Sequence, residues 1–213
     1  MRVERFSVGP LDNNLYLLTA ADTREAIVVD PSIESDGVLE LIERRGLEVK
    51  RILLTHAHID HILTVKRFHD ATGAPVWLHP DDAPLYERGD IQAVSIGVRW
   101  PGSVPVGHWI ADGEDVGLPG LEVRALHTPG HSPGSVTYVT RDGLIVGDVL
   151  FRGSVGRVDL PGGDWDTLVR SVRDRLFRHP PETRVCPGHG PETTIGVEMR
   201  TNPFVGEHAL DRA

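Results

Sequence analysis

The stretch Thr55-His56-Ala57-His58-Ile59-Asp60-His61 contains three imidazoles and one carboxylate within six residues. It follows the apolar run Ile52-Leu53-Leu54, which predicts a buried strand, and it precedes apolar residues at helical spacing. The cluster therefore lies on a strand-to-helix turn, where side chains can converge on one point. Imidazole and carboxylate at this density suit zinc, iron or manganese. The alternative is a polar turn in which Thr55 or Asp60 caps the helix, but capping needs one such residue and not four.

Three later places supply further candidate ligands, and each follows or joins a predicted strand. They are His131 in the stretch Thr128-Pro129-Gly130-His131-Ser132-Pro133-Gly134-Ser135, Asp148 after the apolar run Leu144-Ile145-Val146, and His189 in the stretch Cys186-Pro187-Gly188-His189-Gly190-Pro191. Prolines and glycines restrict the backbone around both histidines. A carboxylate at the end of a buried strand is costly unless a cation meets it. One such fragment is a weak signal, whereas four strand-end sites in this order form a specific pattern.

With these residues the sequence resembles the metallo-β-lactamase superfamily, over nearly the whole chain from Gly9 to about Gly190. The resemblance implies an α/β fold, a four-layer αβ/βα sandwich of two mixed sheets with outer helices, in one domain over residues 1–213. It also implies how the ligands divide between two divalent metal ions. His56, His58 and His131 would hold the first ion, Asp60, His61 and His189 the second, and Asp148 both. Zinc is the expected occupant, and iron or manganese are alternatives, since nitrogen and oxygen ligands suit all three.

Within the superfamily the chain is similar to the glyoxalase II (hydroxyacylglutathione hydrolase) group, especially its short bacterial members. The matching strings are 128–135, 147–151, 153–164 and Asn202-Pro203-Phe204. They imply hydrolysis of S-lactoylglutathione or a related thioester by a hydroxide shared between the metals, which Asp60 guides as a catalytic residue. The chain stops at Ala213, so we expect the longer helical tail that helps full-length members hold glutathione to be largely missing. This leaves the thiol carrier open.

Three residues are expected to contact the substrate: Arg157, Asn202 and Phe204. Arg157 would bind an acidic end of the substrate, and its alternative is a surface ion pair with Asp159 or Asp164. Asn202 and Phe204 lie where the family's tail folds back toward the active site. Their alternative is a C-terminal packing segment.

Other functions stay open at this point. A persulfide dioxygenase with one iron would, by the family's pattern, use His56, His131 and Asp148, which are all present. Lactone or β-lactam hydrolysis depends on pocket shape, which the sequence does not show. A non-catalytic relative would be expected to have lost ligands, and this chain has lost none.

Composition narrows the partners. The 213 residues carry 22 basic and 31 acidic side chains, a net charge of −9, which disfavours nucleic acid. The one cysteine excludes an internal disulfide framework and a cysteine-rich metal site. The first residues lack the apolar core of a signal peptide, and no apolar run approaches the length of a membrane span. We therefore expect a cytoplasmic protein that acts on a small-molecule thioester; the oligomeric state is not predicted.

Hydrophobic periodicity and turn residues place the remaining elements. Strands are predicted near 2–8, 14–20, 26–30, 51–54, 75–78, 121–126, 135–140, 143–147 and 183–186, and helices near 34–45, 60–72, 81–88 and 164–178. Residues 97–108 are predicted to be a loop over a sheet edge. We further expect His127 to orient a metal ligand, His79 to bond the nearby backbone, and Cys186 to be a buried residue closing a strand. Asp30, which ends a strand near the metal face, is a candidate for an orienting role, and its alternative is a carboxylate without such a role.

Overall fold

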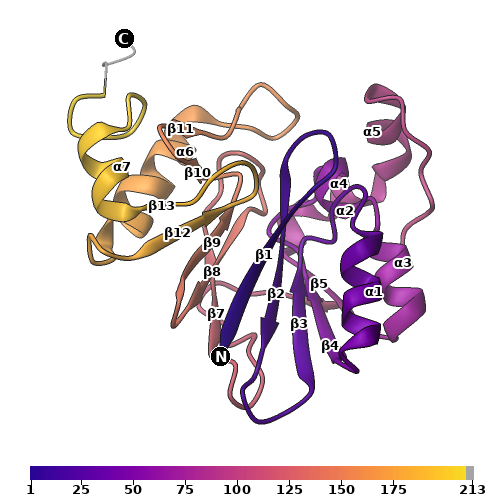
Figure 1. The fold of residues 1–213 in the computed structure, drawn as a ribbon. Coiled ribbons are helices and arrows are strands. Elements are labelled where there is room, and N and C mark those ends of the chain that lie inside the picture. The colour runs from indigo at the N-terminus through magenta and orange to yellow at the C-terminus, as the bar shows by residue number, and fades with distance from the viewer. Residues whose placement is uncertain (210–213) are drawn as a thin grey trace.

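The computed structural model describes residues 1–209 and shows two mixed sheets packed face to face, with helices on both outer sides (Figure 1). The first sheet has the order β1 (Arg2–Val8), β2 (Asn13–Thr19), β3 (Glu25–Val29), β4 (Glu48–Leu53), β5 (Val76–Leu78), β6 (Val106–Trp109). The second has the order β13 (Thr193–Thr194), β12 (Arg184–Pro187), β9 (Gly143–Gly147), β8 (Val136–Thr140), β7 (Val123–His127). A small hairpin joins β10 (Leu150–Phe151) to β11 (Ser154–Val155). The predicted α/β sandwich is confirmed.

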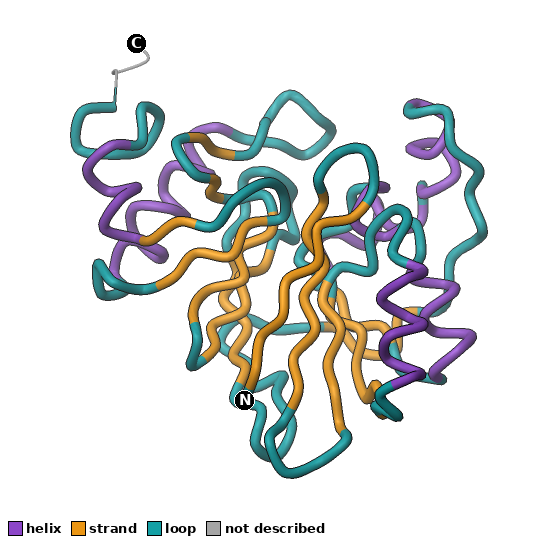
Figure 2. Tube along the Cα trace, viewed as in Figure 1, coloured by secondary structure: helices purple, strands orange, loops and turns teal. Residues whose placement is uncertain are grey.

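The helices form the two outer layers of the sandwich (Figure 2). The first sheet is covered by α1 (Asp36–Arg44) and α3 (Val65–Thr72), and the second by α6 (Trp165–Arg170) and α7 (Ile195–Thr201). Three short helices, α2 (Ile59–Ile62), α4 (Ala83–Glu87) and α5 (Gly89–Ser95), lie at the upper edge of the first sheet in Figure 1. Within residues 1–209, every helix is too short or too polar to span a lipid bilayer.

Three apolar layers hold the sandwich together. Strand β2 shows the logic, because its side chains alternate between the two faces of the sheet. Leu15 and Leu17 pack toward α1 and α3, whereas Tyr16 and Leu18 pack into the layer between the sheets. The third layer lies between the second sheet and its helices, where Val146 of β9 meets Leu168 of α6 and Ile195 of α7. A strand covered on both faces is apolar throughout rather than alternating, as this one is.

The direction of the strands brings distant loops to one edge of the molecule. Strands β3 and β4 are parallel, and so are β9 and β12. Their carboxyl-terminal ends lead into Asp30, the stretch 55–61, Asp148 and His189, respectively. The carboxyl ends of parallel strands are where α/β proteins build their binding sites.

Some elements differ from the prediction. The single helix expected over 60–72 is two helices, because the backbone N–H of Thr64 donates to Pro31 O and its hydroxyl donates to Pro31 and Ser32 carbonyls instead of continuing the helix. Helices α5 and α7 were not predicted. In α5, Ile91 and Val94 face solvent, so the apolar spacing gave no amphipathic signal. The loop expected over 97–108 ends in β6, which extends the first sheet beside β5.

A pair of leucines tests the layer between the first sheet and its helices. Leu17 is fully buried, whereas Leu11, in the turn before β2, leaves 50% of its surface exposed. Leu17→Ala should lower the free energy of unfolding by about 2–5 kcal/mol, because it leaves a cavity. Leu11→Ala should change it by no more than about 0.5 kcal/mol. Chemical denaturation of both variants checks this, and equal effects would contradict the layer described.

Candidate metal centre

Three imidazoles converge from both sheets. His56 and His58 follow β4 of the first sheet, and His131 follows β7 of the second. His58 Nδ1 lies 2.8 Å from His131 Nε2, which lies 3.3 Å from His56 Nε2. All three side chains are buried. This three-histidine cluster is one of the groups whose ligand atoms lie close enough together to share an ion.

Oxygen acceptors fix which ring nitrogen faces inward. His131 Nδ1 donates to the carbonyl of Arg157 at 2.7 Å, so its Nε2 carries the lone pair. The Thr55 hydroxyl donates to Asp30 Oδ2 at 2.6 Å, and it therefore accepts from His56 Nδ1 at 3.0 Å. His56 Nε2 then also carries a lone pair. Metal-binding histidines are characteristically held in this way by an acceptor on the second ring nitrogen.

A second cluster of Asp60, His61 and His189 lies beside the first. His61 Nε2 and His189 Nε2 are 3.1 Å apart, and Asp60 Oδ2 lies 3.4 and 3.2 Å from them. The other ring nitrogens again donate to oxygen, His61 Nδ1 to Asp30 Oδ2 at 3.1 Å and His189 Nδ1 to Leu11 O at 2.8 Å. The orienting role for which Asp30 was one candidate thus corresponds to contacts that reach both clusters.

Asp148 lies between the two clusters. Its Oδ1 is 3.4 Å from His61 Nε2, and its Oδ2 is 3.6 Å from His131 Nε2 and 3.3 Å from His189 Nε2. Gly188 makes room for it, because a Cβ on that glycine would lie 2.1 Å from Asp148 Oδ1 and 2.8 Å from the His61 ring. All seven side chains that the sequence nominated as metal ligands therefore meet at one place.

The donor set fits two metal ions. With their Nδ1 protons donated to oxygen, His56 Nε2 and His131 Nε2 face each other across 3.3 Å, and His61 Nε2 and His189 Nε2 across 3.1 Å. Such pairs repel unless a proton or a cation lies between them. Among residues 1–209, Asp148 Oδ1 is buried without a hydrogen-bond partner. Nitrogen and oxygen ligands without thiolate suit zinc, iron and manganese alike.

The two clusters differ in their electrostatics. Burial and the neighbouring imidazoles hold the pKa of His56 well below its usual value, and burial lowers the pKa of His58 to about 3. Burial also opposes charge on His61, but Asp60 and Asp148 raise its pKa to about 9. Asp148 and Asp60 likewise raise the pKa of His189 to about 11 against its burial. His56 and His58 of the first cluster are therefore neutral imidazoles, whereas His61 and His189 of the second cluster favour positive charge.

The three residues expected to contact substrate have other partners in this structure. The exposed guanidinium of Arg157 makes two hydrogen bonds of 2.7 Å to Asp159. Asn202 is buried at the end of α7, where its amide donates to Ser154 O and Glu198 and its oxygen accepts from the backbone N–H of Phe204. The Phe204 ring meets Trp165 edge-on. These are the alternatives that the sequence left open.

A third group of possible ligands consists of His79, Asp81 and His127 and shares no residue with the two clusters. The two rings are stacked at 4.0 Å and 11°, so their in-plane lone pairs cannot converge on one ion. His127 Nε2 donates to Pro133 O at 2.8 Å, and His79 Nδ1 accepts from the Asp81 N–H. His127 was expected to orient a metal ligand, but its hydrogen bond goes to a proline carbonyl instead.

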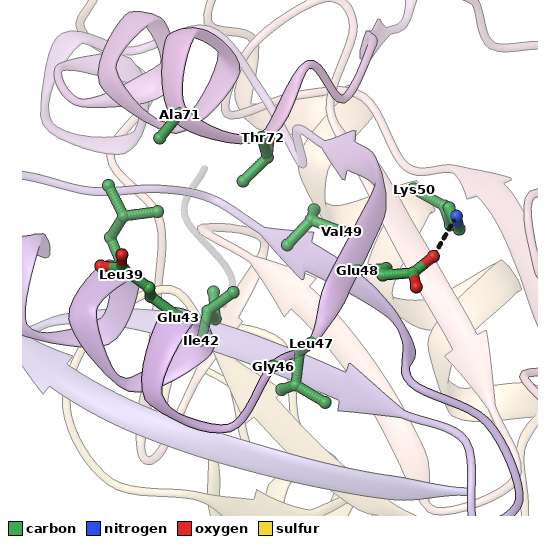
Figure 3. A pocket seen from close by; sticks show the side chains of 10 residues that line it. All are labelled: Leu39, Ile42, Glu43, Gly46, Leu47, Glu48, Val49, Lys50, Ala71 and Thr72. Atoms are coloured by element: carbon green, nitrogen blue, oxygen red, sulfur yellow. Dashed lines mark hydrogen bonds and ion pairs between the residues drawn. The ribbon is translucent and has the colours of Figure 1, made fainter.

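A cavity of about 610 Å³ lies elsewhere, between α1, α3 and the start of β4 (Figure 3). Leu39, Ile42 and Val49 line it, and Lys50 pairs with Glu48 at its margin. The loop that carries His56, His58, Asp60 and His61 leaves β4 at the opposite, carboxyl-terminal end. This cavity is therefore separate from the candidate centre, and none of the seven candidate ligands lines it.

Sequence reasoning missed several side chains that support the centre. Asn13 donates to Asp60 Oδ2 at 2.9 Å. Asp82 accepts from the backbone N–H of Ala57, next to His56, and from the hydroxyl of Ser132, next to His131. Gln92 bonds the backbone at Ala57 and Ile59. These are polar residues at the start of a strand and in short helices, where a polar side chain is ordinary, so the sequence carried no signal that singled them out.

Removing Asp148 should disrupt both clusters at once. Asp148→Ala takes away the carboxylate that faces the histidines of each, so we expect it to abolish binding of both metal ions. Metal analysis after dialysis against divalent zinc, iron or manganese checks this. Asp142→Ala, on the exposed turn before β9, is the control and should bind as the unaltered protein does. Two tightly held ions in Asp148→Ala would contradict the shared position of this carboxylate.

Comparison with known proteins identifies the family. Residues 8–189 match the model of the metallo-β-lactamase superfamily. A probable metallo-hydrolase of Bacillus subtilis, YqgX, is 36% identical, with 99% of this chain and 100% of that protein covered. The hydroxyacylglutathione hydrolase GloC of Haemophilus influenzae is 34% identical, with 96% and 98% covered.

Solved structures agree with these sequence relatives. A di-iron-bound form of TTHA1623 superposes with a TM-score of 0.85 at 45% identity, over 95% of this chain and 100% of that one. The BLEG-1 B3 metallo-β-lactamase gives 0.89 at 36% identity, over 96% and 99%. ETHE1 from Myxococcus xanthus gives 0.81 at 28% identity, over 96% and 84%. The chain belongs to the metallo-β-lactamase superfamily.

Proposed function

We propose that this protein is a metal-dependent hydrolase of thioesters, with S-lactoylglutathione or a related glutathione thioester as its substrate. The observation that carries the proposal is the second cluster. Asp60, His61 and His189 place their ligand atoms close enough together to share an ion. Asp148 lies within 3.6 Å of ring nitrogens in both clusters. A single ion at the three-histidine cluster would not account for the convergence of these three side chains. The name of the Haemophilus influenzae relative supports the choice of substrate.

Two bound divalent ions would supply Lewis acidity and would lower the pKa of a water from 15.7 to about 7, which makes a nucleophile at neutral pH. We propose that His56, His58, Asp60, His61, His131, Asp148 and His189 hold them. The centre is more open at the second cluster, since the His189 side chain exposes 25% of its surface and Asp60 16%, whereas His131 exposes 3%. Substrate would therefore approach from the side of Asp60 and His189.

Side-chain nucleophiles near the centre are otherwise engaged. Burial raises the pKa of the Cys186 thiol to about 12, as fits the expected buried residue that closes a strand. The Ser132 hydroxyl donates to Asp82, and the Ser135 hydroxyl accepts from the Ser132 N–H. Water is thus the favoured nucleophile, and Asp60, fixed by Asn13 at the open side of the centre, is placed to orient it.

A substrate with an acidic end would need a cation near this opening. Arg157 qualifies, because its own carbonyl is bonded to His131 while its guanidinium is exposed. Binding would require the guanidinium to exchange Asp159 for a substrate carboxylate. Asn202 and Phe204 would then affect substrate binding only indirectly. Asn202 bonds the carbonyl of Ser154, in the segment that leads to Arg157.

One observation favours a second candidate, a persulfide dioxygenase with one iron. His56, His131 and Asp148 also meet, with His131 Nε2 lying 3.3 Å from His56 Nε2 and 3.6 Å from Asp148 Oδ2. These three would suffice for such an enzyme, and its reaction would consume oxygen.

The metal-loaded protein should hydrolyse S-lactoylglutathione with a kcat/KM of about 10⁴ M⁻¹s⁻¹ or more. His189→Ala should lose this activity, because the second cluster would be broken. Release of glutathione is measured with a thiol reagent, beside parallel assays of oxygen uptake with glutathione persulfide and of β-lactam hydrolysis. Oxygen uptake that survives His189→Ala, without thioester hydrolysis, would contradict the proposal and support the dioxygenase. Turnover of the β-lactam alone would also contradict it.

Arg157→Ala tests recognition of the acidic end. We expect KM for S-lactoylglutathione to rise several-fold with kcat little changed, because the guanidinium contributes to binding and not to the chemical step. Arg152→Ala, another exposed arginine on the adjacent hairpin turn, is the matched control. Equal, small effects of the two variants would assign Arg157 to its ion pair with Asp159.

A further inference from the structure

Asp82 is a fully buried carboxylate that lies outside the metal-binding set. It ends a turn of 3₁₀-helix over Pro80–Asp82, directly before α4. Burying a charged carboxylate is costly unless its oxygens are satisfied by hydrogen bonds. Its oxygens accept from the backbone N–H of Ala57 at 2.9 Å, the backbone N–H of Gly134 at 2.6 Å and the hydroxyl of Ser132 at 2.8 Å.

These three donors lie beside the ligands of the three-histidine cluster. Ala57 stands between His56 and His58, and Ser132 directly follows His131. The first two histidines belong to a loop of the first sheet and the third to a loop of the second sheet. One carboxylate therefore ties together the two loops that must meet for the three ring nitrogens to converge.

Close packing at Gly134 and hydrogen bonds from Gln92 support the contacts of Asp82 with the two loops. A Cβ on Gly134 would lie 2.6 Å from Asp82 N and 2.8 Å from its Cβ and Cγ, so only glycine allows this approach. The backbone after Ala57 N is also fixed by Gln92. Gln92 Nε2 donates to Ala57 O at 3.0 Å, and Gln92 Oε1 accepts from the Ile59 N–H at 3.1 Å. The segment from Asp82 to Gln92 thus fixes the backbone on which His56 and His58 stand.

The geometry requires a carboxylate and not an amide. Oδ1 faces the Gly134 N–H, and Oδ2 faces both the Ala57 N–H and the Ser132 hydroxyl. An asparagine would turn its NH₂ toward one of the two backbone N–H groups, and neither of these can reverse its polarity. One donor would lose its acceptor, and the loop that carries it would shift.

The second cluster is supported by different groups. His61 is held by Asp30, His189 by the carbonyl of Leu11, and Asp60 by Asn13. We propose that Asp82 is a positioning residue for the three-histidine cluster, acting through the backbone of Ala57 and the loop of His131 to set the affinity of that cluster for metal. This inference rests on the proposed role of the two clusters as metal sites.

The test measures metal binding, not turnover. Zinc affinity is determined by chelator competition for Asp82→Asn placed in two backgrounds, His189→Ala, which leaves the three-histidine cluster, and His131→Ala, which leaves the second. We expect Asp82→Asn to weaken zinc by about 10–100-fold in the His189→Ala background, the usual effect of losing a group that orients a ligand. In the His131→Ala background the affinity should stay nearly unchanged.

Asp81→Asn is the matched control, since it makes the same chemical change one residue away on an exposed side chain, and it should leave both affinities as they were. Ser132→Ala removes one of the three donors and should give a smaller loss with the same selectivity, which keeps the test valid where Asp82→Asn does not fold. Equal losses in both backgrounds, or none, would overturn the inference. Failure of the unaltered protein to bind two zinc ions would instead overturn the proposed function.

Discussion

The candidate centre depends on a fixed position of the two sheets relative to each other, at the edge where the strands that precede the ligand loops end. Its ligands come from loops of both sheets, so a small slide of one sheet over the other would separate them. Two tyrosines in the layer between the sheets oppose such a slide. Tyr16 of β2 donates to Pro187 O at the end of β12, and Tyr138 of β8 donates to Leu54 O just after β4. The carbonyls that they bond directly precede the loops of His189 and His56, so the packing of the core is transmitted to the metal ligands.

Within this framework, oxygen acceptors determine the tautomer and the ring orientation of the histidines. Asp30 is central, because one of its carboxylate oxygens contacts both His61 Nδ1 and the Thr55 hydroxyl that in turn bonds His56. Its backbone adopts φ of +51°, a left-handed conformation that is uncommon for residues other than glycine. Such conformations persist where the surrounding contacts determine them, and they concentrate at functional sites. Hydrogen bonds to one buried carboxyl group thereby orient imidazoles of both clusters.

The resemblance to the superfamily predicted the fold and the meeting of the seven candidate ligands well. The local pattern agreed with it, because these residues stand at strand ends marked by apolar runs and by glycine or proline. The sequence predicted the supporting groups poorly. Asn13 and Asp82 act through hydrogen bonds between segments far apart in the chain, and local patterns carry no information about such pairs. The prediction of one helix over 60–72 was wrong for a related reason. Thr64 donates to the carbonyl of Pro31, in the segment after β3, rather than to its own helix. The partners of Arg157 and Asn202 were expected only as alternatives, because a side chain's choice between substrate and neighbour depends on packing.

The central claim is that two ions share Asp148 in a centre built for hydrolysis. Anomalous diffraction from crystals of the metal-loaded protein, measured above and below the absorption edges of zinc, iron and manganese, tests it most directly. Two peaks about 3.5–4 Å apart, the spacing typical of two-metal sites, are predicted, one at the three-histidine cluster and one at Asp60, His61 and His189, with Asp148 contacting both. A single iron peak bound by His56, His131 and Asp148, with the second cluster empty at saturating metal, would contradict the claim and would indicate an oxygenase.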